Sequence, residues 1–368
     1  MKATQQVHIK SKHILQLDGL RGLAILLVLS FHYFVPLSGI FSLGWSGVDL
    51  FFVLSGFLIT MRLLDTIDSR DYFSHFYRNR ILRIFPLYYL TLILFFLAIY
   101  TLVKEEHLHN IAFYKLHWLS FFVFTQNWSL IFYGHPVDTY ITHFWSLAVE
   151  EQFYILWPFV LYFIRDRKKL FRIMLLALPL IIIVRSGIYI RHPEFNMHRH
   201  YYINTFCRMD SFIIGAIMCF IYRSEINVSN KTIYYLFYLF LLLLCAGIAI
   251  SGNAFFANYF FSTIGYTILA VLYACLLYIS IQTGNFFSAF FEIPFLRFCG
   301  KISYGIYIFH WPVRLIFGFK IYNWAIVHLP FSSSLTEFFS LALCVLLTFI
   351  VSIISFYYFE SYFLRLKK

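Results

Sequence analysis

Runs of about twenty apolar residues recur along the whole chain, and they constrain its fold more than any other feature. A helix of about twenty residues spans the hydrocarbon of a bilayer and satisfies its own backbone hydrogen bonds there. The composition agrees, because 61% of the 368 residues are hydrophobic and only 12% are charged, whereas a soluble domain carries about 25%. We expect an all-α polytopic membrane protein with about ten transmembrane helices, near residues 19–37, 46–64, 84–103, 143–164, 171–190, 209–223, 233–250, 259–281, 299–318 and 337–359.

The distribution of Lys and Arg predicts how these helices are oriented. An even number of spans places both termini on one side, and with cytoplasmic termini 20 of the 29 Lys and Arg lie on inner segments and 8 on outer segments. This asymmetry follows the positive-inside rule. We therefore expect a multi-pass protein of the inner or plasma membrane with both termini in the cytoplasm. The net charge of +12 does not indicate a nucleic-acid partner, because the basic residues bracket apolar spans instead of forming one patch.

The segment 111–133 is apolar enough to suggest a further crossing. A crossing there would place the five cations of 165–172 outside, so we expect 104–142 to form an outer loop with a helix at the membrane interface. No internal repeat, low-complexity tract or polar linker interrupts the sequence. Residues 1–368 are therefore expected to form a single transmembrane domain.

Two ionisable residues, Arg21 and His32, lie inside the first apolar run. Ionisable groups at membrane depth are costly, and they usually face a protein interior or a wet cavity where they have a function. A spacing of eleven residues places the two side chains within roughly 20° of the same helix face and about 16 Å apart along the axis. The alternative is an arginine that snorkels to the interface and a histidine satisfied by a neighbour.

A second pair of arginines, Arg80 and Arg83, precedes the third span. They are three residues apart, so they would lie on one face of a helix. Two forked guanidiniums at the cytoplasmic mouth suit a phosphorylated ligand, although the same pair would also serve only to fix orientation. The basic run at 165–172 is interpreted as an orientation signal alone.

The span 143–164 contains two adjacent carboxylates, Glu150 and Glu151. Adjacent side chains point about 100° apart on a helix, so at most one of them is expected to face a central cavity. His143 shares a helix face with Glu150. A carboxylate about 10 Å from the outer surface needs a cation or a hydrogen-bond donor, or else it protonates.

The span 299–318 carries a polar stripe of Ser303, Tyr307 and His310. His310 is expected at a depth similar to that of His32, because both helices run outward.

Three further charged residues, Asp49, Arg208 and Asp210, open spans from the outer side. Arg208 and Asp210 are two residues apart and do not face each other, so we expect each to pair across helices. Metal binding is not expected. The loop histidines at 107, 109, 192, 198 and 200 have no carboxylate or thiolate partner at ligand spacing, and the six cysteines are scattered singly.

The chain resembles the integral-membrane acyltransferase family 3, whose members are O-acyltransferases that modify bacterial surface glycans and some small molecules. The resemblance covers about residues 15–360 and depends on six strings that occur in family order. These are LDGLRGLAILLVLSFHYF (17–34), GWSGVDLFFVLSGFLIT (44–60), FYRNRILRIFPLYY (76–89), HFWSLAVEEQFYILWP (143–158), CRMDSFIIGAIM (207–218) and GKISYGIYIFHWPV (300–313).

The resemblance implies acyl transfer from a cytoplasmic acyl-coenzyme A, usually acetyl-coenzyme A, to a hydroxyl at or beyond the outer face. It implies that His32 is the catalytic residue and that Arg21 is its essential partner. Some members carry a soluble esterase-like domain after the last helix. No such domain is expected here, because the sequence stops at Lys368.

The physical interpretation agrees with the resemblance. Acyl transfer needs a base for the attacking hydroxyl or a nucleophile that holds the acyl group in passing, and a neutral imidazole serves either role. Arg21, Arg80 and Arg83 would hold the phosphates of coenzyme A. Its pantetheine arm would then reach His32 through a water-poor tunnel open at both ends.

The remaining polar residues of the spans receive supporting roles in this hypothesis. Glu150 or Glu151 would orient the imidazole of His32, with His310 as a rival for the same task. The acceptor, a glycan or another hydroxyl compound, would approach from the outer side past Asp49, Arg208 and Asp210, without a metal ion.

Two alternatives come from other functional classes. A transporter or exporter of a glycan intermediate or a small carboxylic acid would also have ten spans, buried ionisable residues and a basic mouth. The absence of an internal repeat and of paired Gly/Pro-broken spans argues against it. A purely structural membrane subunit fits less well, because it has no use for Arg21, His32 and Glu150 in hydrocarbon.

Overall fold

The structure is a computed structural model that describes residues 14–35, 37–102, 108–194, 199–330 and 332–367. These residues form helices joined by turns, with no strand among them, which confirms the expected all-α fold. The helices are α1 (Leu15–Phe34), η1 (Gly39–Ser46), α2 (Gly47–Thr66), α3 (Tyr72–Leu102), α4 (Leu108–Leu116), α5 (Trp118–Phe122), α6 (Gln126–Tyr133), η3 (Thr142–Phe144), α7 (Trp145–Phe163), α8 (Arg167–Arg191), α9 (Arg199–Tyr202), α10 (Thr205–Tyr222), α11 (Asn230–Ser251), η5 (Phe261–Gly265), α12 (Tyr266–Ile281), α13 (Phe286–Phe291), α14 (Pro294–Lys301), α15 (Ser303–His328), α16 (Ser333–Ile354), η6 (Ser355–Glu360) and α17 (Ser361–Arg365).

Eight helical segments within the described residues are long and apolar enough to cross a membrane. They correspond to eight of the ten expected spans. The other two expected spans fall on α7 and α15, which have 19 and 26 residues but carry more polar side chains. In α7 these are Glu150, Glu151 and Gln152, and in α15 they include Arg314 and Lys320. A count of ten and cytoplasmic termini therefore stay predictions.

The segment 111–133 folds into short helices. α4, α5 and α6 have nine, five and eight residues, and a crossing needs about twenty. Two buried amides tie this region to the helices around it: Gln126 donates to the carbonyl of Phe144 at 2.8 Å, and Asn127 donates to the hydroxyl of Thr205 at 2.9 Å. The segment therefore agrees with the expected loop that packs on the bundle without crossing.

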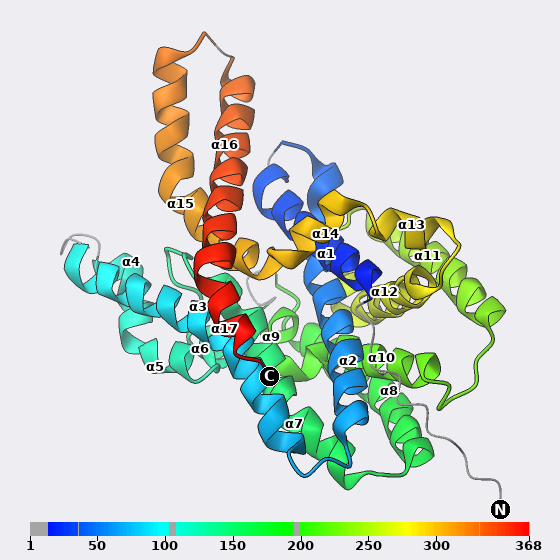
Figure 1. The fold of residues 1–368 in the computed structure, drawn as a ribbon. Helices are drawn as coiled ribbons and strands as arrows, with labels where there is room; N and C mark the ends of the chain where they lie inside the picture. The colour runs from blue at the N-terminus through cyan, green and yellow to red at the C-terminus, as the bar shows by residue number, and fades with distance from the viewer. Residues whose placement is uncertain (1–13, 36, 103–107, 195–198, 331, 368) are drawn as a thin grey trace, which may run out of the picture.

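α1 packs against α2, α14 and η1 in the middle of the molecule (Figure 1). Glycines allow the closest approaches. A Cβ at Gly22 of α1 would lie 2.0 Å from the carbonyl oxygen of Leu296 in α14, and one at Gly56 of α2 would lie 2.1 Å from that of Phe212 in α10. Distances under 3.0 Å are not found for real Cβ atoms, so these helices can approach this closely only where glycine is present.

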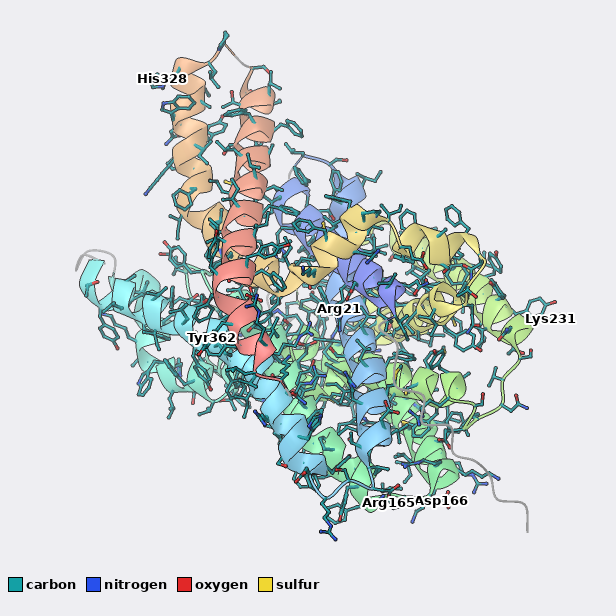
Figure 2. All side chains as sticks on the ribbon, in the orientation of Figure 1. Arg21, Arg165, Asp166, Lys231, His328 and Tyr362 are labelled. Carbon is teal, nitrogen blue, oxygen red and sulfur yellow. The ribbon has the colours of Figure 1, made fainter. Side chains whose placement is uncertain are left out.

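The last two long helices form a separate feature of the fold. α15 and α16 pack side by side as a hairpin that projects from the other helices (Figure 1). Figure 2 shows His328 near its tip, Arg165 and Asp166 at the turn between α7 and α8, and Arg21 among the central helices. The exposed position of Arg165 and Asp166 agrees with the interpretation of 165–172 as an orientation signal.

Candidate active site

Arg21 lines a large cavity of about 1050 Å³. Its walls are the start of α1, the end of α2, the first part of α3, α14 and the chain after α16. Cations outnumber carboxylates in the lining. The basic residues are Arg21, Arg62, Arg80, Arg83, Arg297, Lys301 and Lys367, and the acidic ones are Asp18, Asp65 and Glu360. A concave basic surface of this kind concentrates polyanionic ligands.

A smaller cavity of about 100 Å³ adjoins the large one, because both share the lining residues Arg21, Arg80 and Arg83. The structure thus brings together the three arginines that the sequence suggested as phosphate-binding residues. α3 is continuous from Tyr72, which places Arg80 and Arg83 on one helix. Arg21 forms an ion pair with Asp18 at 3.1 Å, and the guanidinium of Arg80 lies 5.3 Å from the ring centre of Tyr154.

The two adjacent carboxylates of α7 have different surroundings. Glu150 lines the small cavity and accepts a hydrogen bond from Ser55 at 2.8 Å, and Ser55 accepts one from Tyr154 at 3.0 Å. Glu151 is buried on another face, and its Oε1 has no hydrogen-bond partner among the described residues. Glu150 is therefore the carboxylate that faces the cavity, as expected for at most one of the two.

Three histidines gather beyond the inner end of the small cavity. The ring centres of His32 and His310 are 4.9 Å apart, and so are those of His310 and His143. His143 Nε2 lies 3.1 Å from the carbonyl oxygen of Tyr307, and His310 Nδ1 lies 2.7 Å from the same oxygen. His32 Nδ1 lies 3.0 Å from the carbonyl oxygen of Val28 and 3.3 Å from His310 Nε2.

These contacts fix the tautomers, because a carbonyl oxygen only accepts hydrogen bonds. His310 must carry its proton on Nδ1, which leaves its Nε2 free to accept a hydrogen bond from His32. His32 must also carry its proton on Nδ1, and this N–H donates to both the carbonyl oxygen of Val28 and Nε2 of His310. The Nε2 atom of His32 is consequently unprotonated, and the side chain is partly exposed. This nitrogen is available as a base or a nucleophile.

The orientation of His32 therefore comes from His310. Neither Glu150 nor Glu151 is hydrogen-bonded to an imidazole of this group within the described residues. Of the alternatives that the sequence left open, His310 is the residue in contact with His32, whereas α7 presents Glu150 to the arginine-lined cavity.

The two cavities do not reach His32, which lines neither of them. Ser146 and Tyr307 line the small cavity on the side toward His143, and their hydroxyls are hydrogen-bonded to each other. The hydroxyl of Tyr307 also donates to the carbonyl oxygen of His143 at 2.7 Å. These hydrogen bonds join α7 and α15 between the small cavity and the histidines, and a tunnel that reaches His32 stays a prediction.

The predicted outer-side residues form buried ion pairs across helices. Arg208 pairs with Asp49 at 2.6 Å, and Asp210 pairs with Arg185 at 2.7 Å, and all four side chains are fully buried. The expected pairing across helices is thus present. None of the four lines either cavity. Such pairs fix the relative positions of α2, α8 and α10, since removing one partner strands a buried charge.

Two residues of these clusters were missed by sequence reasoning. His143 shares a helix face with Glu150, a signal that was visible but not connected to His32. Arg185 lies inside the apolar run 171–190, where an ionisable residue by itself indicates a buried partner.

The described residues contain no group of three or more His, Cys, Asp or Glu side chains placed to hold a metal ion. Of the loop histidines, His192 and His200 stack with ring centres 4.8 Å apart. His107 and His198 lie outside the described residues, and the side chain of His109 is not described.

Comparison with known proteins identifies the family of the chain. The sequence model of the acyltransferase domain family matches residues 14–357. The putative peptidoglycan O-acetyltransferase YrhL of Bacillus subtilis is 32% identical over 330 residues, which are 83% of this chain and 49% of the relative.

Two other relatives are similarly close. The O-acetyltransferase OatA of Staphylococcus aureus is 28% identical over 328 residues, covering 81% of this chain and 50% of the relative. The peptidoglycan O-acetyltransferase OatA of Listeria monocytogenes is 28% identical over 331 residues, covering 82% and 49%. This chain spans about half the length of these relatives, and no solved structure matches it. Because the family model matches nearly its whole length, the chain belongs to the integral-membrane acyltransferase family.

Proposed function

We propose that this protein is an O-acetyltransferase of the inner or plasma membrane that moves an acetyl group from acetyl-coenzyme A to a hydroxyl of a glycan. The relatives named peptidoglycan O-acetyltransferases support a cell-envelope glycan as the acceptor. The basic cavity supports a donor that carries several phosphates. Its cations suit the cytoplasmic side of the membrane, where the donor would be supplied.

The observation that carries this proposal is the pairing of two features on one helix. α1 holds Arg21 on the wall of the basic cavity and His32, with an unprotonated Nε2, eleven residues further along. About 16 Å separate these positions along the helix axis. An extended arm of the kind that links the phosphates of coenzyme A to its thioester fits this separation.

His32 Nε2 takes the proton of the acceptor hydroxyl while the hydroxyl oxygen attacks the carbonyl carbon of the thioester. The carbon–sulfur bond then breaks, and the imidazolium returns the proton to the departing sulfur. In the other order, Nε2 attacks the carbonyl carbon first, the carbon–sulfur bond breaks and the thiolate of coenzyme A departs. The hydroxyl oxygen then attacks the acetyl carbon, the bond from that carbon to Nε2 breaks, and the hydroxyl proton passes to the thiolate. Both orders use the same nitrogen, so both need the tautomer that His310 and Val28 hold.

The route from the cavity to His32 passes Ser146 and Tyr307. For the thioester to reach Nε2, the hydrogen-bonded pair of hydroxyls has to separate when the donor binds. Arg21, Arg80 and Arg83 hold the phosphates, and Glu150 with Ser55 faces the middle of the arm, where amide groups offer N–H donors to the carboxylate.

Inside-out membrane vesicles test the proposal against the alternative of a transporter. Radiolabelled acetyl-coenzyme A is supplied outside the vesicles, on the face that was cytoplasmic, with a glycan acceptor trapped inside. An acetyltransferase produces label in ester linkage on the trapped glycan, and His32→Ala abolishes the ester while the protein remains inserted. Label that enters the vesicles without forming an ester, or full ester formation by His32→Ala, would contradict the proposal.

A further inference from the structure

Arg314 lies one helical turn beyond His310 on α15, and the proposed reaction does not use it. Residues four apart share a helix face, so Arg314 continues the face that carries His310. Its guanidinium lies 5.3 Å from the ring centre of Trp311 and 5.8 Å from that of Tyr33. The ring centre of Trp311 lies in turn 5.0 Å from that of His32. Arg314 is thus a cation beside the reactive imidazole, and it lines neither basic cavity.

The donors of Arg314 have no protein partner among the residues that the structure describes. A guanidinium has five N–H donors in a planar fork, and the side chain of Arg314 is partly exposed. No hydrogen bond or ion pair to these donors occurs within the part of the chain that the structure describes. Glu337 on α16 acts on Arg314 through its charge, but the two form no ion pair among the described residues. Among the described residues, the arginine therefore contacts aromatic rings and its fork has no hydrogen-bond partner.

Trp311 supplies a flat surface at the same place. Its ring centre lies 5.0 Å from that of His32, and its indole N–H donates to Thr139 at 3.1 Å from the carbonyl oxygen and 3.2 Å from the hydroxyl oxygen. These contacts hold the ring in one orientation while the side chain stays partly exposed. A partly exposed aromatic ring whose polar edge is already hydrogen-bonded offers apolar surface to a ligand beside His32.

We propose that Trp311 and Arg314 form the acceptor subsite, and that this subsite selects a sugar carrying a carboxylate close to the hydroxyl that reacts. Trp311 would support the sugar ring next to His32, and the fork of Arg314 would bind the carboxylate through two parallel hydrogen bonds. The proposal depends on the proposed function, because it takes His32 as the residue that accepts the hydroxyl proton. It also replaces Asp49, Arg208 and Asp210 as acceptor-side residues, since those side chains are fully buried.

Two matched acceptors test this subsite in vesicles containing the full chain. One is a peptide-free tetramer of alternating N-acetylglucosamine and N-acetylmuramic acid, whose lactyl groups carry carboxylates, and the other is its methyl ester. We expect the unmodified protein to favour the acid by about 10- to 100-fold in kcat/KM, because a charge-assisted pair is lost with the ester. Arg314→Gln should remove this preference, mainly by raising KM for the acid, and Arg314→Lys should retain part of it.

Lys320 provides the matched control, because it is an exposed cation on the same helix. Lys320→Gln should leave the preference for the acid unchanged. Equal losses for acid and ester in Arg314→Gln, or an unchanged preference, would overturn the subsite. If His32→Ala is inactive while Arg314→Gln keeps the preference, the subsite fails and the proposed function survives. If His32→Ala is fully active, the proposed function fails.

Binding of the same tetramers to the purified protein in detergent micelles gives a readout that does not require turnover. Isothermal titration should show tighter binding of the acid than of the ester, and the difference should disappear in Arg314→Gln. Equal affinity of the unmodified protein for acid and ester would refute the carboxylate preference even if neither tetramer is acetylated.

Discussion

Replacing His310 by leucine should slow the transfer step without weakening the binding of either substrate. His310 Nε2 accepts a hydrogen bond from His32 Nδ1 at 3.3 Å, and the His310 side chain has no exposed surface. It therefore acts on the reaction through His32 and is a positioning residue. Leucine keeps the site apolar and of similar volume but has no acceptor for the His32 proton.

The size of the effect follows from the change in charge during the reaction. While His32 is neutral, its hydrogen bond to His310 contributes about 1 kcal/mol, and once His32 has taken the proton the bond contributes about 1.5–3 kcal/mol. Only the difference, about 0.5–2 kcal/mol, accelerates the step. We expect kcat to fall about 2- to 30-fold in His310→Leu, with KM for donor and acceptor unchanged. The bond from His32 to Val28 remains and keeps the loss at this moderate level.

Single-turnover transfer of radiolabelled acetyl groups in vesicles measures this step. His310→Gln is the matched variant, because its amide oxygen still accepts a hydrogen bond, and it should recover part of the lost rate. A thermal unfolding curve in detergent for each variant separates a slower reaction from a loss of folded protein. A loss beyond about a thousandfold with intact folding would refute the reasoning, because His310 would then take part in the chemistry. An unchanged kcat would show that His310 does not orient His32.

Three other predictions concern stability and pH. Arg208→Met strands the buried carboxylate of Asp49 and should lower the stability in detergent by about 3–5 kcal/mol; an unchanged midpoint of thermal unfolding would contradict the role of this pair. Gly56→Ala adds a Cβ 2.1 Å from a backbone oxygen of α10 and should lower the free energy of unfolding by about 1–3 kcal/mol. Gly187→Ala, with nothing within 4 Å of the added Cβ, should not lower it, and equal effects of the two substitutions would refute the close packing of α2 on α10. Burial, together with the neighbouring arginines, lowers the pKa of Lys367 to about 7, so its amine becomes a cation as the pH falls through 7. Because that cation attracts the phosphates of the donor, KM for acetyl-coenzyme A should fall as the pH falls over the same range. A pH dependence of KM that persists in Lys367→Gln would exclude this lysine as its source.

Part of the site could be predicted from local spacing. Arg80 and Arg83 lie on one continuous helix, and only Glu150 of the carboxylate pair faces the cavity. The sequence determines these features directly, because spacing along a helix fixes which side chains share a face. The same rule placed Arg21 and His32 on one helix, and both lie on α1.

The remaining features depend on how helices cross. The expected similar depth of His310 and His32 made His310 one candidate partner of His32, but the sequence could not decide between it and the carboxylates of α7. It gave no sign that His143 would join them, because the three histidines lie on different elements more than a hundred residues apart. The same holds for Arg185, which pairs with Asp210 through packing of α8 on α10. The hydrogen bond between Ser146 and Tyr307 is likewise a consequence of how α7 meets α15.

The central claim, that the unprotonated nitrogen of His32 carries the transfer, is tested most directly by mass spectrometry of the envelope glycans of cells that produce the chain. Cells with the unmodified protein should show glycans heavier by one acetyl group, and cells with His32→Ala should lack them. His328→Ala, which changes a histidine near the tip of the α15–α16 hairpin, should preserve the modification. Acetylated glycans at the normal level in cells whose only copy is His32→Ala would contradict the claim.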